Sequence, residues 1–130
     1  GVPYRRGDFD WTDSNIPHDQ LNWLEGDLAA ATAPVCVLVH QRLDCEAPMG
    51  VRNAPAVREV LERSGKVRAV FQGHEHIGGY SRIGDIHYCT LKGIVEGSSP
   101  EANAYAVVDF HPDGTICIEG FRMQSGSRLD

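Results

Sequence analysis

The sequence has no long apolar run and no excess of positive charge. Its longest run of aliphatic and cysteine residues, Val35 to Val39, spans five residues, whereas a membrane-spanning helix needs about 20. The first 20 residues contain no apolar stretch typical of a signal peptide. The net charge is −6, from 12 basic and 18 acidic residues. These absences argue against membrane insertion and against charge-driven binding to nucleic acids, so we expect a cytoplasmic protein.

Closely spaced cysteine pairs are also missing. The sequence has four cysteines: Cys36, Cys45, Cys89 and Cys117. They form no Cys-x-x-Cys pair, so a zinc site built from cysteines is unsupported. Cys36 and Cys117 lie in apolar, strand-like runs, where a reduced cysteine behaves as a small hydrophobic residue. We therefore expect free thiols rather than disulfides.

The apolar patterning predicts a domain of the α/β class. The chain has 130 residues, of which 42% are hydrophobic, enough for one core. Helices are expected from Pro17 to about residue 31, with leucines on one face, and from Asn53 to Ser64. Apolar, β-branched runs predict parallel strands over 35–39 and 67–71, the first of them buried on both faces.

Antiparallel strands are expected in the second half of the chain. Residues 80–91 predict a hairpin that turns at Gly84 and Asp85. Two further strands, over 104–110 and 115–121, are joined by a turn. We therefore expect one domain over residues 1–130 whose mixed sheet ends in an antiparallel meander. It consists of an extended loop (1–16), a core (17–122) and a polar tail (123–130).

Three of the six histidines follow the two predicted parallel strands. His40 comes directly after the first strand, and His74 and His76 follow the second. Because the carboxyl ends of neighbouring parallel strands meet at one sheet edge, these imidazoles are expected to lie together. Neutral imidazole is the commonest metal ligand. The sequence therefore predicts a metal site formed by His40, His74 and His76; the alternative is a set of loop histidines with satisfied hydrogen bonds.

The backbone around this histidine pair has its own expected geometry. In an extended chain, His74 and His76 point to the same side and Glu75 points away. Gly73 before them, and Gly78 and Gly79 after them, would let the chain turn tightly and approach a bound ion.

Other polar residues have simpler interpretations. His87 is expected to face solvent from the middle of a strand, while His18 and His111 belong to a helix start and a turn. Asp44 and Glu46, in the loop after the first strand, could face the same sheet edge. A solvated loop charge is the more frequent role for such residues.

The sequence resembles the calcineurin-like metallophosphoesterases over roughly residues 17–122. The resemblance is carried by Gly73-His74-Glu75-His76 after a strand, and by the preceding strand that ends in His40. Residues 20–25 resemble the helix before that strand. Residues 73–80 and 91–96 are similar to the branch that includes the manganese-dependent ADP-ribose/CDP-alcohol diphosphatases. The resemblance implies one half of a four-layer α/β sandwich.

The resemblance also implies a site. His40 and His74 would bind one divalent ion and His76 a second; the ions would be Mn, Fe or Zn. Two ions are expected in the complete enzyme and one or none in this chain alone. A hydroxide bridging the ions would hydrolyse a small-molecule phosphodiester or diphosphate. A phosphomonoesterase, a cyclic-nucleotide phosphodiesterase and a non-catalytic metal- or partner-binding module are the alternatives.

Tyr80, Gly78 and Gly79 are the candidate substrate-binding residues. Tyr80 could stack on a base or simply pack as a strand residue.

The acidic motifs of the family's amino-terminal half are missing from this sequence. The segment Gly7-Asp8-Phe9-Asp10-Trp11 begins like the Gly-Asp-x-x-Asp motif but has Trp11 in place of its second Asp. The bridging Asp and the general-acid His are therefore expected in a missing half, and no catalytic residue is assigned to this chain. We expect the carboxy-terminal half of an enzyme, inactive alone, that associates with the missing half or with itself through exposed apolar surface.

Overall fold

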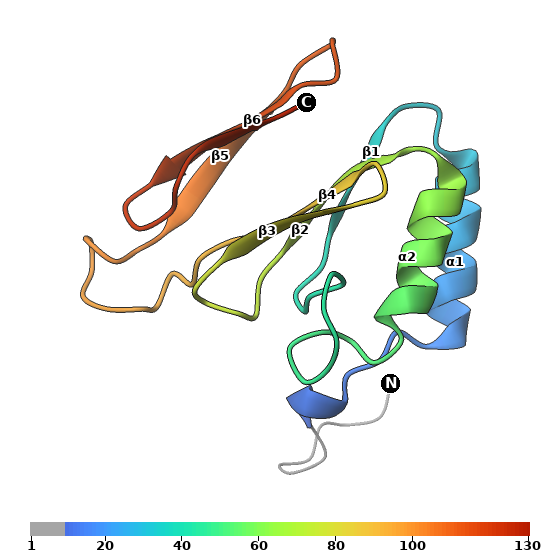
Figure 1. Ribbon diagram of the computed structural model, residues 1–130, viewed down its shortest axis with the longest axis horizontal. Coiled ribbons are helices and arrows are strands. Elements are labelled where there is room, and N and C mark those ends of the chain that lie inside the picture. Colours follow the sequence, from blue (N-terminus) through green and yellow to red (C-terminus); the bar gives the residue numbers. More distant parts are fainter. Residues whose placement is uncertain (1–9) are drawn as a thin grey trace.

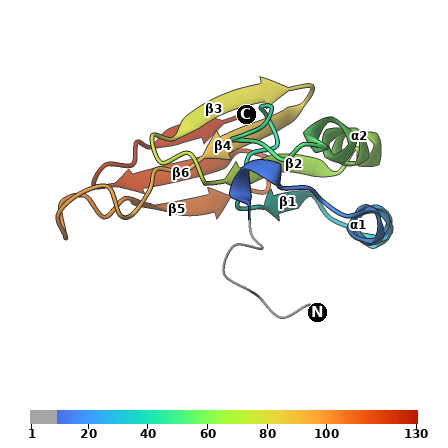
Figure 2. The ribbon, with the colours of Figure 1, turned by 90° about the horizontal axis from the view of Figure 1, so that it is seen from below.

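The computed structural model describes residues 10–130, which form three layers: a pair of helices, a mixed sheet and an antiparallel sheet (Figure 1). In chain order the elements are η1 (Trp11–Asp13), α1 (His18–Ala30), β1 (Val35–Leu38), α2 (Ala54–Ser64), β2 (Val67–Gln72), β3 (Gly79–Ile83), β4 (Ile86–Thr90), β5 (Tyr105–Phe110), β6 (Ile116–Phe121) and β7 (Ser127–Leu129). The α/β fold class is as predicted. In the view from below, the strands of the two sheets overlap and both helices lie beside them (Figure 2).

The strands form two sheets. In the first sheet the order is β1-β2-β4-β3; β1, β2 and β4 are parallel, and β3 pairs antiparallel with β4. The second sheet is an antiparallel meander with the order β5-β6-β7. The predicted meander is thus a sheet of its own, stacked on the first, and the carboxyl ends of β1 and β2 lie at one edge as expected.

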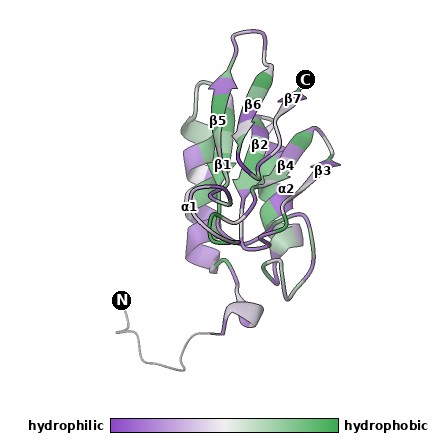
Figure 3. Ribbon diagram, turned by 90° about the vertical axis from the view of Figure 1, so that its left-hand side faces the viewer, coloured by the Kyte–Doolittle hydropathy of each residue, from purple (hydrophilic) through white to green (hydrophobic). Residues whose placement is uncertain are grey.

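Each face of the first sheet has a separate core. The helices pack on one face, in a cluster centred on the fully buried Leu61, Val70 and Tyr88. The second sheet packs on the other face around Ala69, Phe71 and Ile116. Figure 3 shows hydrophobic residues concentrated on β2, β5 and β6, while α1 is largely hydrophilic outside. Burial of both faces explains why β2 is mostly apolar, with Arg68 as its one exposed residue.

The ends of α2 follow from local sequence. A proline lies in its first turn, and Gly65 ends it in the left-handed conformation with φ of 64°. Lys66 then donates from Nζ to three carbonyl oxygens at the carboxyl end of α1, at 2.7, 2.9 and 2.7 Å. This cation satisfies acceptors that the helix leaves open and joins the two helices.

Three local predictions were wrong. Strand β1 is not buried on both faces, since Val35 to Val37 are half-buried and Leu38 is 81% exposed. Among residues 10–130 it pairs only with β2, so it is an edge strand. His87 does not face solvent but is 7% exposed, because the second sheet covers that face. The stretch after Met123 is not only a tail, since β7 pairs with β6 there.

The remaining expectations concern the cysteines, the amino-terminal loop and membrane insertion. All four cysteines are free, as predicted. The expected extended loop contains the short helix η1, and residues 1–9 of that loop lie outside the described part of the chain. Within residues 10–130, none of the helices combines the length and apolar character needed to cross a membrane.

Candidate metal site

His40 and His74 are brought together by backbone pairing beyond the ends of β1 and β2. The amide of Val39 donates to the carbonyl of Phe71 at 3.1 Å, and that of Gly73 donates to the carbonyl of His40 at 2.9 Å. The parallel pairing therefore continues two residues beyond β1 and one residue beyond β2. It places His40 beside Gly73 and one residue from His74, as the sequence predicted for these two histidines. The predicted grouping of all three with His76 does not form among residues 10–130.

One ring nitrogen of His40 faces one ring nitrogen of His74. His40 Nε2 and His74 Nδ1 are 3.4 Å apart, and the rings meet edge-on with centroids 5.3 Å apart. Two histidine nitrogens at about 2.0–2.1 Å from a tetrahedral ion would be separated by about 3.3–3.4 Å. The pair therefore fits two corners of one metal coordination shell. Within residues 10–130, no three His, Cys, Asp or Glu side chains are grouped so as to hold an ion.

The protonation state of His74 also suits ligation. Burial lowers the pKa of His74, and the neighbouring His40 and His76 lower it further. The neutral imidazole is therefore favoured, and only the neutral ring has a free lone pair for a metal.

His74 and His76 are not arranged as the extended chain predicted. His74 has φ of 67°, in the left-handed region, and His76 lies in a turn, so the expectation of a shared face in extended backbone was wrong. It is His74, not Gly73, that takes the positive φ. The turn is closed by short backbone hydrogen bonds, from Glu75 to Gly73 at 2.8 Å and from Gly78 to Glu75 at 3.0 Å.

His76 is held by two residues that sequence reasoning missed. Its Nδ1 lies 2.5 Å from Glu96 Oε1, and among residues 10–130 Nε2 has no hydrogen-bond partner. A ligating histidine and its orienting carboxylate usually have this arrangement. Gly93 donates its amide to the carbonyl of His76 at 2.9 Å. A side chain at Gly93 would place Cβ only 2.6 Å from His76 Cγ. Both contacts join segments that are far apart in the chain, so local sequence pattern does not predict them.

Trp11 covers one side of the histidine pair. Its ring centroid is 4.9 Å from that of His74, at an angle of 56°. Gln41 Nε2 donates to the carbonyl of Trp11 at 2.7 Å and ties η1 to the loop after β1. The residue that departs from the acidic family motif thus lies against a candidate ligand.

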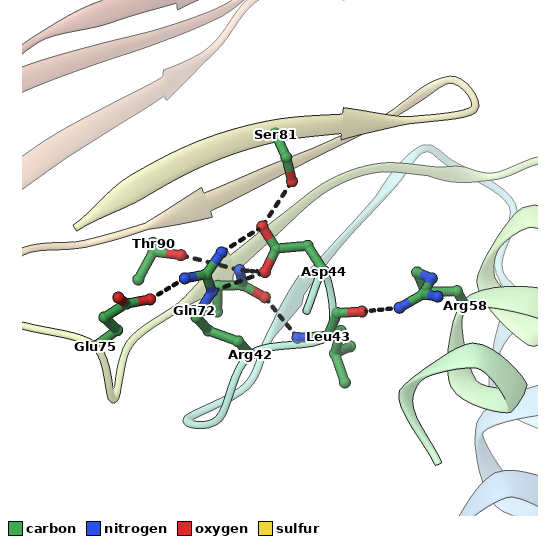
Figure 4. A network of polar contacts seen from close by, with 8 residues as sticks. All are labelled: Arg42, Leu43, Asp44, Arg58, Gln72, Glu75, Ser81 and Thr90. Carbon is green, nitrogen blue, oxygen red and sulfur yellow. Dashed lines mark hydrogen bonds and ion pairs between the residues drawn. The ribbon is translucent and has the colours of Figure 1, made fainter. Parts of the chain in front are cut away.

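Asp44 is the centre of a buried polar network beside this site (Figure 4). Its side chain is 1% exposed, so the expectation of a solvated loop charge was wrong. Arg42 donates from Nε and Nη2 to the two carboxylate oxygens at 2.9 and 3.1 Å. Gln72 Nε2 and Ser81 Oγ each donate at 2.6 Å. The loop after β1, the end of β2 and strand β3 therefore meet at one carboxylate.

These contacts keep Asp44 ionised. Burial raises its pKa, but the hydrogen bonds from Arg42, Ser81 and Gln72 and the charge of Arg42 together lower it below the ordinary value. In return, Asp44 raises the pKa of Arg42. Arg42 also pairs through Nη1 with Glu75, so Glu75 turns to this network rather than joining the histidines.

The candidate substrate-binding residues lie on β3 and at its start. Tyr80 is 57% exposed; its hydroxyl lies 2.9 Å from His87 Nδ1, and the rings stack at 6.0 Å. Gly78 has φ of 77°, and a Cβ there would lie 2.8 Å from Lys92 Cγ. Gly79 lies beside Thr90. The close approach at these glycines is thus to the neighbouring strand and the loop after it.

Comparison with known proteins supports the fold. No protein-family model matches the sequence, and no curated protein matches it. Among solved structures, a dimetal phosphatase from Danio rerio is similar, with a TM-score of 0.76 and 21% identity. The alignment covers 87% of this chain and 38% of that chain, so this chain spans well under half of its length. The chain therefore has a metallophosphoesterase-like fold over part of such a domain.

Proposed function

We propose that this chain supplies histidine ligands to the metal centre of a phosphoesterase. The main support for this proposal is the 3.4 Å separation between His40 Nε2 and His74 Nδ1 at the carboxyl ends of two parallel strands. Open α/β sheets place their ligands at that edge. The likeness to a dimetal phosphatase supports the same assignment.

Each histidine has a distinct part in this proposal. His40 and His74 would hold one divalent ion between them, and His76 would present Nε2 to a second while Glu96 fixes its ring. The ions would be Mn, Fe or Zn, all of which accept imidazole ligands. When bound, they would supply Lewis-acid activation of a phosphate ester toward hydrolysis.

The substrate we propose is a small-molecule phosphodiester or diphosphate. The resemblance of residues 73–80 and 91–96 to the ADP-ribose/CDP-alcohol diphosphatase branch supports this class. Tyr80 would present its exposed ring to the substrate while His87 holds its hydroxyl. A phosphomonoesterase or a cyclic-nucleotide phosphodiesterase would use the same metal ligands. The substrate-binding loops of a shared fold decide among these activities.

The remaining metal ligands would come from another polypeptide segment, which we propose as the partner. Strands β1 and β5 are the outer strands of the two sheets on the same side of the molecule (Figure 2). Exposed apolar side chains lie on both, among them Leu38, Tyr105 and Phe110. Open strand edges and apolar side chains together favour addition of further strands.

A non-catalytic metal-binding module is the second candidate. It is favoured by one observation: in the described part of the chain only two ligand nitrogens converge at the distance that one ion requires. Such a module would bind one ion without hydrolysing a phosphate ester.

The test of the metal assignment is calorimetric titration of Zn²⁺ into the chain and into single variants. We expect His40→Ala and His74→Ala to weaken binding at least tenfold. The control is His111→Ala, in an exposed turn, which should leave binding unchanged. Equal affinities in all four proteins would contradict the metal site. Hydrolysis of bis(p-nitrophenyl) phosphate, with and without a companion segment that supplies the acidic motifs, then separates the enzyme from the module.

A further inference from the structure

The turn that carries His74 has a backbone conformation that needs outside support. A left-handed φ of 67° is unfavourable for a residue with a side chain, and histidine has no glycine-like freedom. Non-glycine residues keep such conformations where surrounding contacts determine them. The neighbouring Glu75 is where those contacts converge.

Arg42 links Glu75 to the buried carboxylate of Asp44. Its guanidinium contacts Asp44 through Nε and Nη2 and Glu75 through Nη1 (Figure 4). The Arg42 side chain is 18% exposed and that of Glu75 is 32% exposed. A planar guanidinium that is fixed on one side by two hydrogen bonds presents its third donor in a set direction.

Asp44 is itself fixed to β2, which leads into the site, and to β3, which follows it. Gln72, the last residue of β2, donates to Asp44 and accepts from the amide of Leu43 at 2.9 Å. Ser81 of β3 donates to the other carboxylate oxygen. The position of Asp44 is therefore set by the sheet and not by the loop alone.

We propose that Arg42 and Asp44 form a positioning clamp that holds Glu75 and thereby turns His74 toward His40. The clamp extends the proposed function and rests on the metal site proposed above. None of the three residues would touch the ion. Glu75, Arg42 and Asp44 act in series, from the turn that carries His74 to the buried sheet.

The clamp differs in its consequences from a network that only stabilises the loop. A stabilising network would change the free energy of unfolding and leave the folded histidine pair as it is. A clamp sets the distance between the two imidazoles in a chain that is still folded. Glu75 distinguishes the two roles because it is the partly exposed end of the series, so its loss leaves the buried bonds of Asp44 intact.

The experiment compares Glu75→Ala with Glu46→Ala. Glu46 is an exposed acid in the loop after β1, so the control removes the same charge from the same region. The first readout is the nuclear Overhauser effect between the ring protons of His40 and His74 in the metal-free chain, whose ring centroids are 5.3 Å apart. The second is Zn²⁺ affinity, which falls about 10–100-fold when an outer partner of a ligand is lost.

We expect Glu75→Ala to lose the ring-to-ring effect and to bind Zn²⁺ at least about tenfold more weakly, with Glu46→Ala like the wild type. Glu75→Gln keeps an acceptor for Arg42 and should recover part of both signals. An unchanged ring-to-ring effect in folded Glu75→Ala would overturn the clamp, whatever the affinities.

The same measurements distinguish a failure of the clamp from a failure of the proposed metal site. If the wild type binds no Zn²⁺ but the ring-to-ring effect is present and is lost in Glu75→Ala, the positioning role is supported and the metal assignment is contradicted. If both chains bind Zn²⁺ equally and keep the effect, the metal site is supported and the clamp is contradicted. The two proposals are therefore tested independently.

Discussion

Two polar clusters at the same end of the first sheet have opposite characters. The buried carboxylate of Asp44 accepts hydrogen bonds from three side chains, which satisfy both of its oxygen atoms. At the histidine pair, His40 is exposed and His74 half-buried. Within the described part of the chain, the facing nitrogens contact only each other, at 3.4 Å. A filled, buried network stabilises a fold, whereas an unfilled pair is available to a ligand. The Asp44 network therefore supports the fold, while the histidine pair a few residues away is the candidate ligand site.

The largest expected effect comes from breaking the filled cluster. Asp44→Ala removes the buried carboxylate that accepts hydrogen bonds from Arg42, Gln72 and Ser81. Loss of one member of a buried ion pair costs about 3–5 kcal/mol, and we expect a decrease of that size in the free energy of unfolding, measured by urea denaturation. Asp27→Ala, on the exposed face of α1, is the control and should change stability by less than about 0.5 kcal/mol. A similar small effect at Asp44 would mean that its network does not support the fold.

A smaller effect is expected from protonating Asp44. Because the folded-state pKa lies below the unfolded value of about 3.9, ionised Asp44 stabilises the fold at neutral pH. That contribution is lost as the pH falls through the folded pKa. Unfolding free energy should therefore decrease more between about pH 5 and pH 2 in the wild type than in Asp44→Asn. Parallel pH profiles would show that the carboxylate is not favoured in its ionised form.

His74 is expected to show that the site costs stability. A residue with a side chain in the left-handed conformation costs roughly 1–2 kcal/mol relative to glycine. His74→Gly should therefore be about 1 kcal/mol more stable than His74→Ala, since both lack the imidazole and differ in that backbone cost. Thermal unfolding of the two variants measures the difference. Equal stabilities would show that this position carries no backbone strain.

The smallest effect on stability is expected at His40. Its side chain is exposed, so His40→Ala should change the free energy of unfolding by less than about 0.5 kcal/mol while removing Zn²⁺ binding. Urea denaturation and calorimetry on the same sample check both statements. A loss comparable to that of Asp44→Ala would remove the contrast between the two clusters.

The sequence predicted the parts of the fold that local pattern controls. Alternating helices and apolar runs identified α1, α2, β1 and β2, and parallel pairing then placed His40 beside His74. The prediction that β1 is buried on both faces was wrong, because a short apolar sequence does not distinguish an edge strand from a central strand. His87 was misjudged because nothing local indicates that a second sheet covers its strand.

The missed site residues depend on contacts between distant segments. Glu96 meets His76 across 20 residues, and Glu75 meets Arg42 across 33. Asp44 resembles any acid in a polar loop, and only the arrangement of β2 and β3 around it shows that it is buried. Long-range polar contacts of this kind have no periodicity, so propensity and spacing do not reveal them.

The most direct test of the metal site is a ¹⁵N spectrum of the histidine rings during titration with Zn²⁺. We expect His40 Nε2 and His74 Nδ1 to respond together, since these two atoms face each other at 3.4 Å. The ring nitrogens of His18 and His111, which lie at exposed positions, should not respond. Because binding at one ring nitrogen leaves the proton on the other, the shifts would show which atom is the ligand. A proton on His40 Nε2 or His74 Nδ1 in the zinc-bound form, or equal responses at all histidines, would contradict a metal held between His40 and His74.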